Sequence, residues 1–181
     1  MDLINTCVTL LLLLAAVRTD LHCGRIRNRL ILTGLAAGTV LMLLQNAPDA
    51  CLMYLAAAFL PVPLFWGLFR LRFLGAGDIK LMCVLGLLCG LRPQGQSIAA
   101  AFLIAAVCGC IRLLKERQLL LSLYRVFTRL YGRLFLHTGL SITGADAALH
   151  RICFAPALLY GYILVRILSL AGISPAEWLA V

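Results

Sequence analysis

Residues 50–69 read ACLMYLAAAFLPVPLFWGLF, a run of twenty residues without a charged side chain. An α-helix needs roughly 20 apolar residues to cross the hydrocarbon core of a bilayer, so this run has the length and composition of a membrane span. Pro61 and Pro63 interrupt it near its middle. The run predicts a helical protein, because membrane-spanning strands would show alternating polar and apolar residues, and that pattern is absent from the sequence.

The rest of the chain has the same character. Of its 181 residues, 63% are hydrophobic and 13% are charged, compared with about 25% charged residues in an average soluble domain. Five further apolar segments are Leu3–Val17, Leu30–Leu44, Ile79–Leu91, Ile98–Ile111 and Ile152–Leu170. We expect the short ones to extend into their flanks. The predicted fold class is an all-α, polytopic membrane protein with about six transmembrane helices, forming one transmembrane domain over residues 1–181.

The basic residues predict the orientation of these helices. Fourteen of the sixteen Lys and Arg residues lie in three segments, residues 18–29, 70–80 and 112–151, which alternate with segments poor in basic residues. Cytoplasmic loops of membrane proteins carry the excess of Lys and Arg. We therefore expect a multi-pass protein of the inner (plasma) membrane, with both termini outside and the three basic segments in the cytoplasm.

The longest of these segments, residues 112–151, is too apolar for a simple linker. Arg125, Arg129 and Arg133 recur at intervals of four, opposite a run of leucines and a phenylalanine. This pattern predicts an amphipathic helix lying in the cytoplasmic membrane interface. A seventh span is the alternative, but three arginines would make its insertion costly.

Other functional classes are poorly supported. The net charge of +9 would suit nucleic-acid binding in a soluble protein, but here the basic residues are explained by the orientation of the loops. The eight cysteines form no C-x-x-C pair and mostly lie in apolar segments. We therefore expect no nucleic-acid partner, no zinc site and no disulfide framework.

Two of the seven acidic residues are placed alike. Asp20 follows the first apolar segment and Asp78 precedes the fourth, so both fall at the cytoplasmic ends of predicted spans. Asp78 could be a helix N-cap, because aspartate satisfies the free amide groups of a first turn. Alternatively, two close carboxylates could share one proton, with one acting as base and the other as acid. That is the chemistry of aspartic proteases.

The residues just before Asp78 favour the second interpretation. Gly75 and Gly77 form the pattern G-x-G-D, and paired glycines provide flexibility or close backbone approach that a simple cap does not need. The segment GAGDIKL at 75–81 resembles the G-x-G-D motif of the type IV prepilin peptidases, a family of intramembrane aspartic proteases.

Two further blocks carry the resemblance. DLHCGRIRNRLIL at 20–32 is similar to the family's aspartate followed by I-P-N, with Asp20, Ile26 and Asn28 in register. Phe154-Ala155-Pro156 is similar to an F-x-P block before the final span. Arg27 stands where the family has proline, which leaves the geometry of that turn open.

The resemblance implies an endopeptidase that cleaves the basic leader from membrane-anchored pilin or pseudopilin precursors at the cytoplasmic membrane face. It implies that Asp20 and Asp78 are catalytic and that no metal or cofactor is needed. Some members also methylate the new N-terminus through an extra domain with paired cysteines. The sequence lacks that insert, so we expect the short, peptidase-only form.

Residues near the two acids could shape the site. We select Gly75, Gly77, Lys80 and Asn28 for substrate binding or site shaping; Lys80 could favour ionised Asp78, neutralise substrate or simply extend toward water. A different class of function stays open, namely a noncatalytic membrane protein such as a small transporter or an assembly subunit of a pilus or secretion system. A transporter would carry ionisable groups or broken helices near the bilayer midplane, and the two prolines of the third segment keep that alternative in place.

Overall fold

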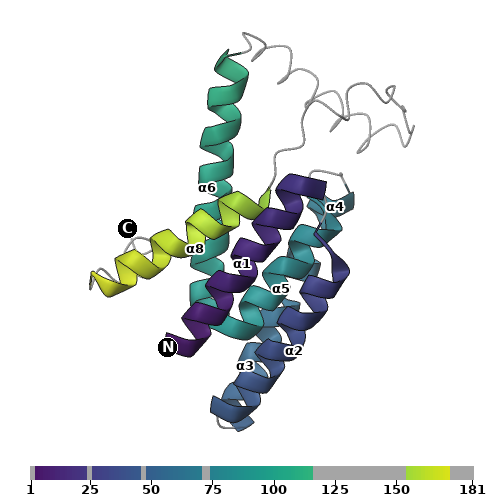
Figure 1. Ribbon diagram of the computed structural model, residues 1–181, viewed down its shortest axis with the longest axis vertical. Coiled ribbons are helices and arrows are strands. Elements are labelled where there is room, and N and C mark those ends of the chain that lie inside the picture. The colour runs from purple at the N-terminus through teal and green to yellow at the C-terminus, as the bar shows by residue number, and fades with distance from the viewer. Residues whose placement is uncertain (1–2, 24–25, 46–47, 71–73, 116–153, 172–181) are drawn as a thin grey trace. The chain divides into compact units, whose positions relative to one another are not determined.

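The computed structural model describes residues 3–23, 26–45, 48–70, 74–115 and 154–171 (Figure 1). Within these ranges the chain forms α-helices and no strand. The helices are α1 (Leu3–Cys23), α2 (Asn28–Gln45), α3 (Pro48–Phe59), α4 (Pro61–Arg70), α5 (Ala76–Cys89), α6 (Leu91–Lys115) and α8 (Phe154–Leu170). The predicted all-α fold class is confirmed.

The helices coincide with the predicted apolar segments, and the short segments extend into their flanks. α1 continues past Val17 to Cys23, because no glycine or proline interrupts the sequence there. α6 begins at Leu91 and ends at Lys115, beyond both ends of the predicted segment. The extension of α1 matters most for the site, since it places Asp20 inside a helix instead of in the loop that follows.

The third predicted segment forms two helices because of its prolines. Pro61 has no amide hydrogen, so it cannot donate to the carbonyl of Ala57, and the helix is broken at this point. The Leu60 amide donates to the Ala56 carbonyl of α3 at 2.9 Å, and the Leu60 carbonyl accepts from the Leu64 amide of α4 at 3.3 Å. Taken together, Ala50–Arg70 is long and apolar enough to cross a membrane.

α5 is the central helix of the bundle and contacts α1, α2, α3 and α4 (Figure 1). All its residues from Val84 to Cys89 are buried. A Cβ atom added to Gly86 would lie 2.6 Å from the Ala57 carbonyl oxygen, so α3 crosses α5 with its backbone against this glycine. The hydrophobic effect does not drive helices together inside a membrane. Their association depends on close van der Waals packing, which small residues such as glycine allow.

A single residue joins α5 to α6. Gly90 has φ 79°, a left-handed conformation that favours glycine. Its amide donates to the Gly86 carbonyl at 2.9 Å and so ends α5. The buried side chain of Gln94 then turns back from α6 and donates through Nε2 to the Met82 carbonyl at 2.9 Å. These contacts hold the C-terminal end of α5 in place.

α8 packs against α1 and against the first part of α6. Gly161 allows the second contact, because a Cβ atom there would lie 2.8 Å from the backbone nitrogen of Ala101. The buried Phe154 opens α8 and packs on Phe102, with ring centroids 5.1 Å apart. The F-x-P block therefore forms the first turn of the final helix, and does not precede it as the resemblance implied.

The chain divides into two compact units, the first comprising Met1–Ile104 with Cys153–Val181 and the second Ala105–Ile152. In the second unit the structure describes only residues 105–115, which form the C-terminal part of α6. The predicted amphipathic helix with Arg125, Arg129 and Arg133 lies outside the described residues.

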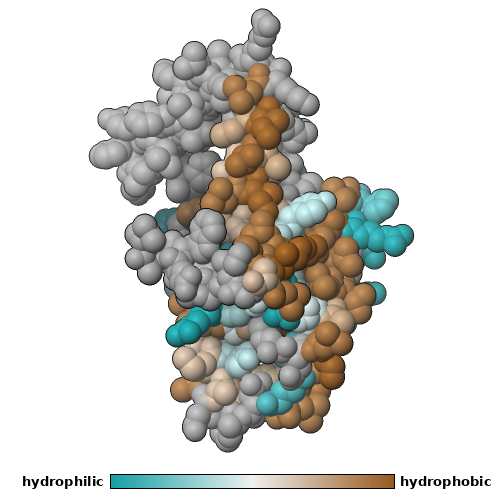
Figure 2. Space-filling view, turned by 90° about the vertical axis from the view of Figure 1, so that its left-hand side faces the viewer, coloured by the Kyte–Doolittle hydropathy of each residue, from teal (hydrophilic) through white to brown (hydrophobic). Residues whose placement is uncertain are grey.

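The described helices suit a membrane. Four segments are long and apolar enough to span one, namely Leu3–His22, Asn28–Gln45, Ala50–Arg70 and Leu91–Ile111. α8 and α5 are shorter, with 17 and 14 residues. Hydrophobic residues cover much of the visible surface of the described helices (Figure 2), and exposed side chains such as Leu14, Leu43 and Leu103 contribute to it. The protein is embedded in the membrane through several helices.

Candidate functional site

Asp20 lies in the last turn of α1 and is buried, with 8% of its surface exposed. It belongs to a stripe of buried residues at intervals of three and four along α1. The other members of the stripe are Asn5, Thr9, Leu13 and Ala16. Because residues at this spacing share one helical face, the carboxylate of Asp20 points toward the rest of the bundle and away from the membrane.

Asp78 lies in the first turn of α5 and is partly buried. Its Oδ2 atom accepts a hydrogen bond from the Gly75 amide at 3.2 Å, which is one half of a capping box. The N-cap residue itself is Gly75, so the simple prediction that Asp78 caps the helix is wrong in position, although its carboxylate does satisfy a free amide. This bond orients the carboxylate at the helix end.

The two glycines before Asp78 differ in their surroundings. A Cβ atom on Gly75 would lie 2.9 Å from Asp78 Oδ2, so a side chain there would crowd the carboxylate. A Cβ atom on Gly77 would lie 3.4 Å from Ile26, which is an ordinary contact. Neither glycine has positive φ. The reason for glycine at 75 is therefore space beside the carboxylate, whereas the surroundings of Gly77 leave room for a Cβ atom.

The carboxylates of Asp20 and Asp78 are close enough to influence each other. The pKa of Asp78 is raised from 3.8 to about 6, first because burial disfavours the charged form, and further because Asp20 adds a negative charge nearby; the Gly75 amide partly offsets both effects. Asp78 precedes the apolar run that begins at Ile79 and so lies at the end of the helix. A carboxyl group with this pKa holds its proton at mildly acidic pH and exchanges it near neutrality.

Lys80 and Asn28 join the beginnings of α5 and α2. The Lys80 ammonium donates to the Asn28 amide oxygen at 3.4 Å, and both side chains are exposed. Together with the contact of Gly77 and Ile26, this bond gathers all the site residues predicted from the sequence at one end of the bundle.

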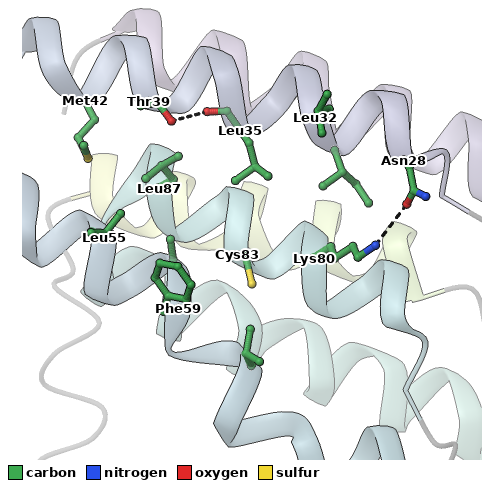
Figure 3. A pocket seen from close by; sticks show the side chains of 13 residues that line it. Asn28, Leu32, Leu35, Thr39, Met42, Leu55, Phe59, Lys80, Cys83 and Leu87 are labelled. Atoms are coloured by element: carbon green, nitrogen blue, oxygen red, sulfur yellow. Dashed lines mark hydrogen bonds between the residues drawn. The ribbon is translucent and has the colours of Figure 1, made fainter.

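An apolar groove leads away from this end along the bundle (Figure 3). It has a volume of about 610 Å³, and α2, α3, α4 and α5 form its walls. Asn28 and Lys80 lie together at one end of it, and Met42 lies far along α2 from them (Figure 3). Its remaining lining residues are Ile31, Leu32, Leu35, Thr39, Leu55, Ala58, Phe59, Val62, Cys83 and Leu87.

No group of three or more His, Cys, Asp or Glu side chains that could hold a metal ion occurs among the residues that the structure describes.

The chain matches the model of the type IV leader peptidase family over residues 7–113, which is more than half of its length. It belongs to the type IV leader peptidase family. The matched region contains Asp20, Asp78 and the helices that carry them, and it ends before the F-x-P block at Phe154. No curated protein and no solved structure matches the chain.

Sequence reasoning about this leader peptidase missed the groove and the buried polar residues of α1. The groove depends on how α2 and α4 stand apart over α5, which the local sequence does not specify. The polar residues did carry a signal: Asn5, Thr9 and Asp20 repeat at helical spacing within a segment rich in leucine. Polar side chains that share one face of a membrane helix indicate the buried face.

Proposed function

We propose that the protein is an aspartic endopeptidase that removes the basic leader from type IV prepilin-like precursors, in the short form without a methyltransferase domain. Membership in the leader peptidase family supports the reaction class. The observation that carries the assignment to residues is the pairing of Asp20 and Asp78, which lie at the ends of two contacting helices and interact electrostatically. We assign these two side chains as the catalytic groups.

In this mechanism Asp78 begins with the shared proton, because burial and the charge of Asp20 both favour its neutral form. Asp20 accepts a proton from water, the water oxygen bonds to the scissile carbonyl carbon, and Asp78 donates its proton to the carbonyl oxygen. The C–N bond then breaks as Asp20 passes its proton to the leaving nitrogen. The carbonyl re-forms and returns a proton to Asp78, so one water has been added across the amide.

The groove supplies a place for the rest of the substrate. A membrane-anchored precursor presents an apolar helix directly after its leader, and the groove begins at Lys80, two residues from Asp78. Residues 28 and 42 of α2 both line it and lie about 21 Å apart along the helix axis, at about 1.5 Å per residue. A precursor helix seated there would have its N-terminal end, and hence the scissile bond, beside the carboxylates. Asn28 and Lys80 would contact the chain where it enters.

The proposed orientation follows from the basic segments. Residues 18–29 contain Asp20, residues 70–80 contain Asp78, and both segments are rich in Lys and Arg. The site therefore faces the cytoplasm, and both termini lie outside the inner (plasma) membrane. In this position the site meets precursors before their leaders are removed. The substrates that fit are pilin or pseudopilin precursors anchored in the same bilayer.

The test replaces each aspartate by asparagine in the full-length protein and follows cleavage of a membrane-anchored precursor. Asparagine keeps the shape of the side chain but cannot carry the shared proton. Asp20→Asn and Asp78→Asn should each lower the cleavage rate by at least about a thousandfold, and the double variant should lose little more, because groups that act as a unit are not additive.

Asp49→Asn is the matched control, since it changes an acid in the first turn of α3 and should leave cleavage unchanged. All four variants must reach the membrane at normal abundance for the comparison to hold. Normal processing by either single variant of the pair would overturn the assignment and favour a noncatalytic membrane protein.

A further inference from the structure

A second polar contact joins α1 and α5 at the end of the pair that lies away from the aspartates. The side chains of Thr9 and Cys89 are buried, and Thr9 Oγ1 lies 3.7 Å from Cys89 Sγ. Thr9 Oγ1 also lies 2.6 Å from the Asn5 carbonyl, to which it donates its only proton. The thiol of Cys89 is then the donor to the Thr9 oxygen. The contact therefore has a direction and a preferred geometry.

α8 encloses this contact. Tyr162 is fully buried, and its hydroxyl lies near the side chains of Thr9 and Cys89 without a hydrogen bond to either. One turn further along α8, the Arg166 guanidinium donates to the Thr6 hydroxyl of α1. Polar contacts between helices are the directional part of packing in a membrane, where apolar side chains pack almost equally well in several arrangements.

The Thr9–Cys89 contact and the two aspartates lie in the same register. Asp20 follows Thr9 by eleven residues on α1, and Asp78 precedes Cys89 by eleven residues on α5. The helices are antiparallel, because Thr9, early in α1, contacts Cys89, late in α5. Asp20, late in α1, interacts electrostatically with Asp78, early in α5. Eleven residues make roughly three turns and about 16 Å of helix, so on each helix the aspartate and the residue of the polar contact lie on the same face.

A change of register would separate the carboxylates. Moving one helix by a single residue shifts it by about 1.5 Å and turns the facing side chain by about 100°. Between Thr9 and Asp20, α1 buries only Leu13 and Ala16 on this face, and these side chains impose little direction. The contact of Thr9 and Cys89 is a directional link between α1 and α5 that does not involve the two acids.

We propose that Thr9 and Cys89 are positioning residues that fix the rotation and height of α1 against α5, and thereby bring Asp20 and Asp78 together. The inference rests on the proposed function only for its effect on cleavage; the effect on geometry stands without it. A buried polar pair between membrane helices can contribute to stability alone. The test must therefore measure the distance between residues 20 and 78, at the other end of α1 and α5.

The first experiment measures that distance. In full-length protein carrying Asp20→Cys and Asp78→Cys, a short thiol-specific cross-linker joins the two substituted positions, and mass spectrometry of the joined peptides gives the yield. Adding Thr9→Val removes the hydroxyl at nearly constant shape and should lower the initial cross-linking rate about three- to tenfold, which corresponds to the usual strength of one polar contact between membrane helices. Thr9→Ser keeps the hydroxyl and should restore the rate.

Thr33→Val is the matched control, because the exposed Thr33 also donates to a carbonyl of its own helix, that of Leu30 at 2.9 Å. It should leave cross-linking unchanged. Equal cross-linking in the parent and in Thr9→Val would overturn the proposal, whatever the result for cleavage.

The second experiment uses the same Thr9 substitutions with the aspartates intact. Thr9→Val should lower kcat for precursor cleavage by the same three- to tenfold factor and leave KM unchanged, since the groove that holds the substrate does not include Thr9. Thr9→Ser should recover kcat. A fall in protein abundance with no change in kcat would mean that the pair serves stability alone and would also overturn the proposal. Absence of cleavage by the parent protein would refute the proposed function and leave the cross-linking result valid.

Discussion

Toward its C-terminal end α5 is surrounded by other helices, and every side chain from Val84 to Cys89 is buried, whereas at its N-terminal end Gly75 and Lys80 are exposed and Asp78 is only partly buried. Glycine serves opposite purposes in these two regions. Gly86 lets the backbone of α3 come close, while Gly75 keeps a side chain away from a carboxylate. One region of the helix is therefore held by packing, and the other is left open to solvent.

Substitutions in the packed region of α5 should lower the stability of the protein. A Cβ atom at Gly86 would meet the backbone oxygen of Ala57 and the side chain of Gln94, each at 2.6 Å. Because backbone cannot move aside as a flexible side chain can, Gly86→Val should lower the free energy of unfolding by about 3 kcal/mol. Thermal unfolding of the purified protein in detergent measures this. Gly67→Ala is the control, because nothing lies within 4 Å of the added atom, and it should leave Tm nearly unchanged. Equal Tm values for Gly86→Val and Gly67→Ala would show that close packing at Gly86 does not stabilise the protein.

The open end should respond to pH. The folded protein binds a proton at Asp78 with a pKa of about 6, above the ordinary value of 3.8. Folding is therefore favoured by this group at pH below about 4, and the contribution is lost as pH rises through about 6. Between pH 4 and pH 7 the parent should lose about 2 kcal/mol of stability from this source.

The Asp78→Asn variant has no carboxyl proton to lose at this position. Its free energy of unfolding should therefore lack this part of the dependence on pH. Chemical unfolding at several pH values measures the difference between the two proteins. A parent and an Asp78→Asn variant with the same dependence on pH would show that the carboxyl is not buried as described.

A smaller effect is expected at the glycine beside the acid. Gly75 has φ −77° and ψ 148°, which alanine adopts without strain, so Gly75→Ala should fold normally. Its added carbon would lie 2.9 Å from Asp78 Oδ2 and displace the carboxylate. We expect kcat for precursor cleavage to fall about tenfold, since small misplacements of reacting groups are costly.

Gly77→Ala provides the comparison, because its added carbon would make only an ordinary contact with Ile26. It should reduce cleavage much less than Gly75→Ala does. If both substitutions reduced cleavage equally, the glycines would act through chain flexibility and not through the space beside Asp78.

Hydropathy and charge were sufficient to predict the helices and the placement of both acids at helix ends. They could not predict which face of each helix is buried, because most of these helices are apolar on all sides and hydrophobic periodicity is weak. α1 is the exception, since Thr9 and Asp20 indicate its buried face. On α5 the residues after Lys80 are apolar, glycine or cysteine, so its central position became visible only through its neighbours.

Two local features also lay beyond the sequence. The prolines predicted an interrupted span, but not that the carbonyl freed by Pro61, that of Ala57, would lie against Gly86. The G-x-G-D pattern suggested that both glycines matter to the acid, yet only Gly75 borders the carboxylate of Asp78. Such distinctions depend on the relative placement of residues from different helices, which no local pattern encodes.

The shortness of α5 has a consequence for how it can stand in a membrane. Its 14 residues span about 21 Å, compared with about 30 Å for the hydrocarbon core. Helices α1, α2, α3 and α4 contact α5, so when α5 crosses the membrane as proposed, the missing length faces protein and not lipid. The exposed residues Gly75 and Lys80 lie at the beginning of this short helix, where water can reach the carboxylate of Asp78 without a dedicated channel.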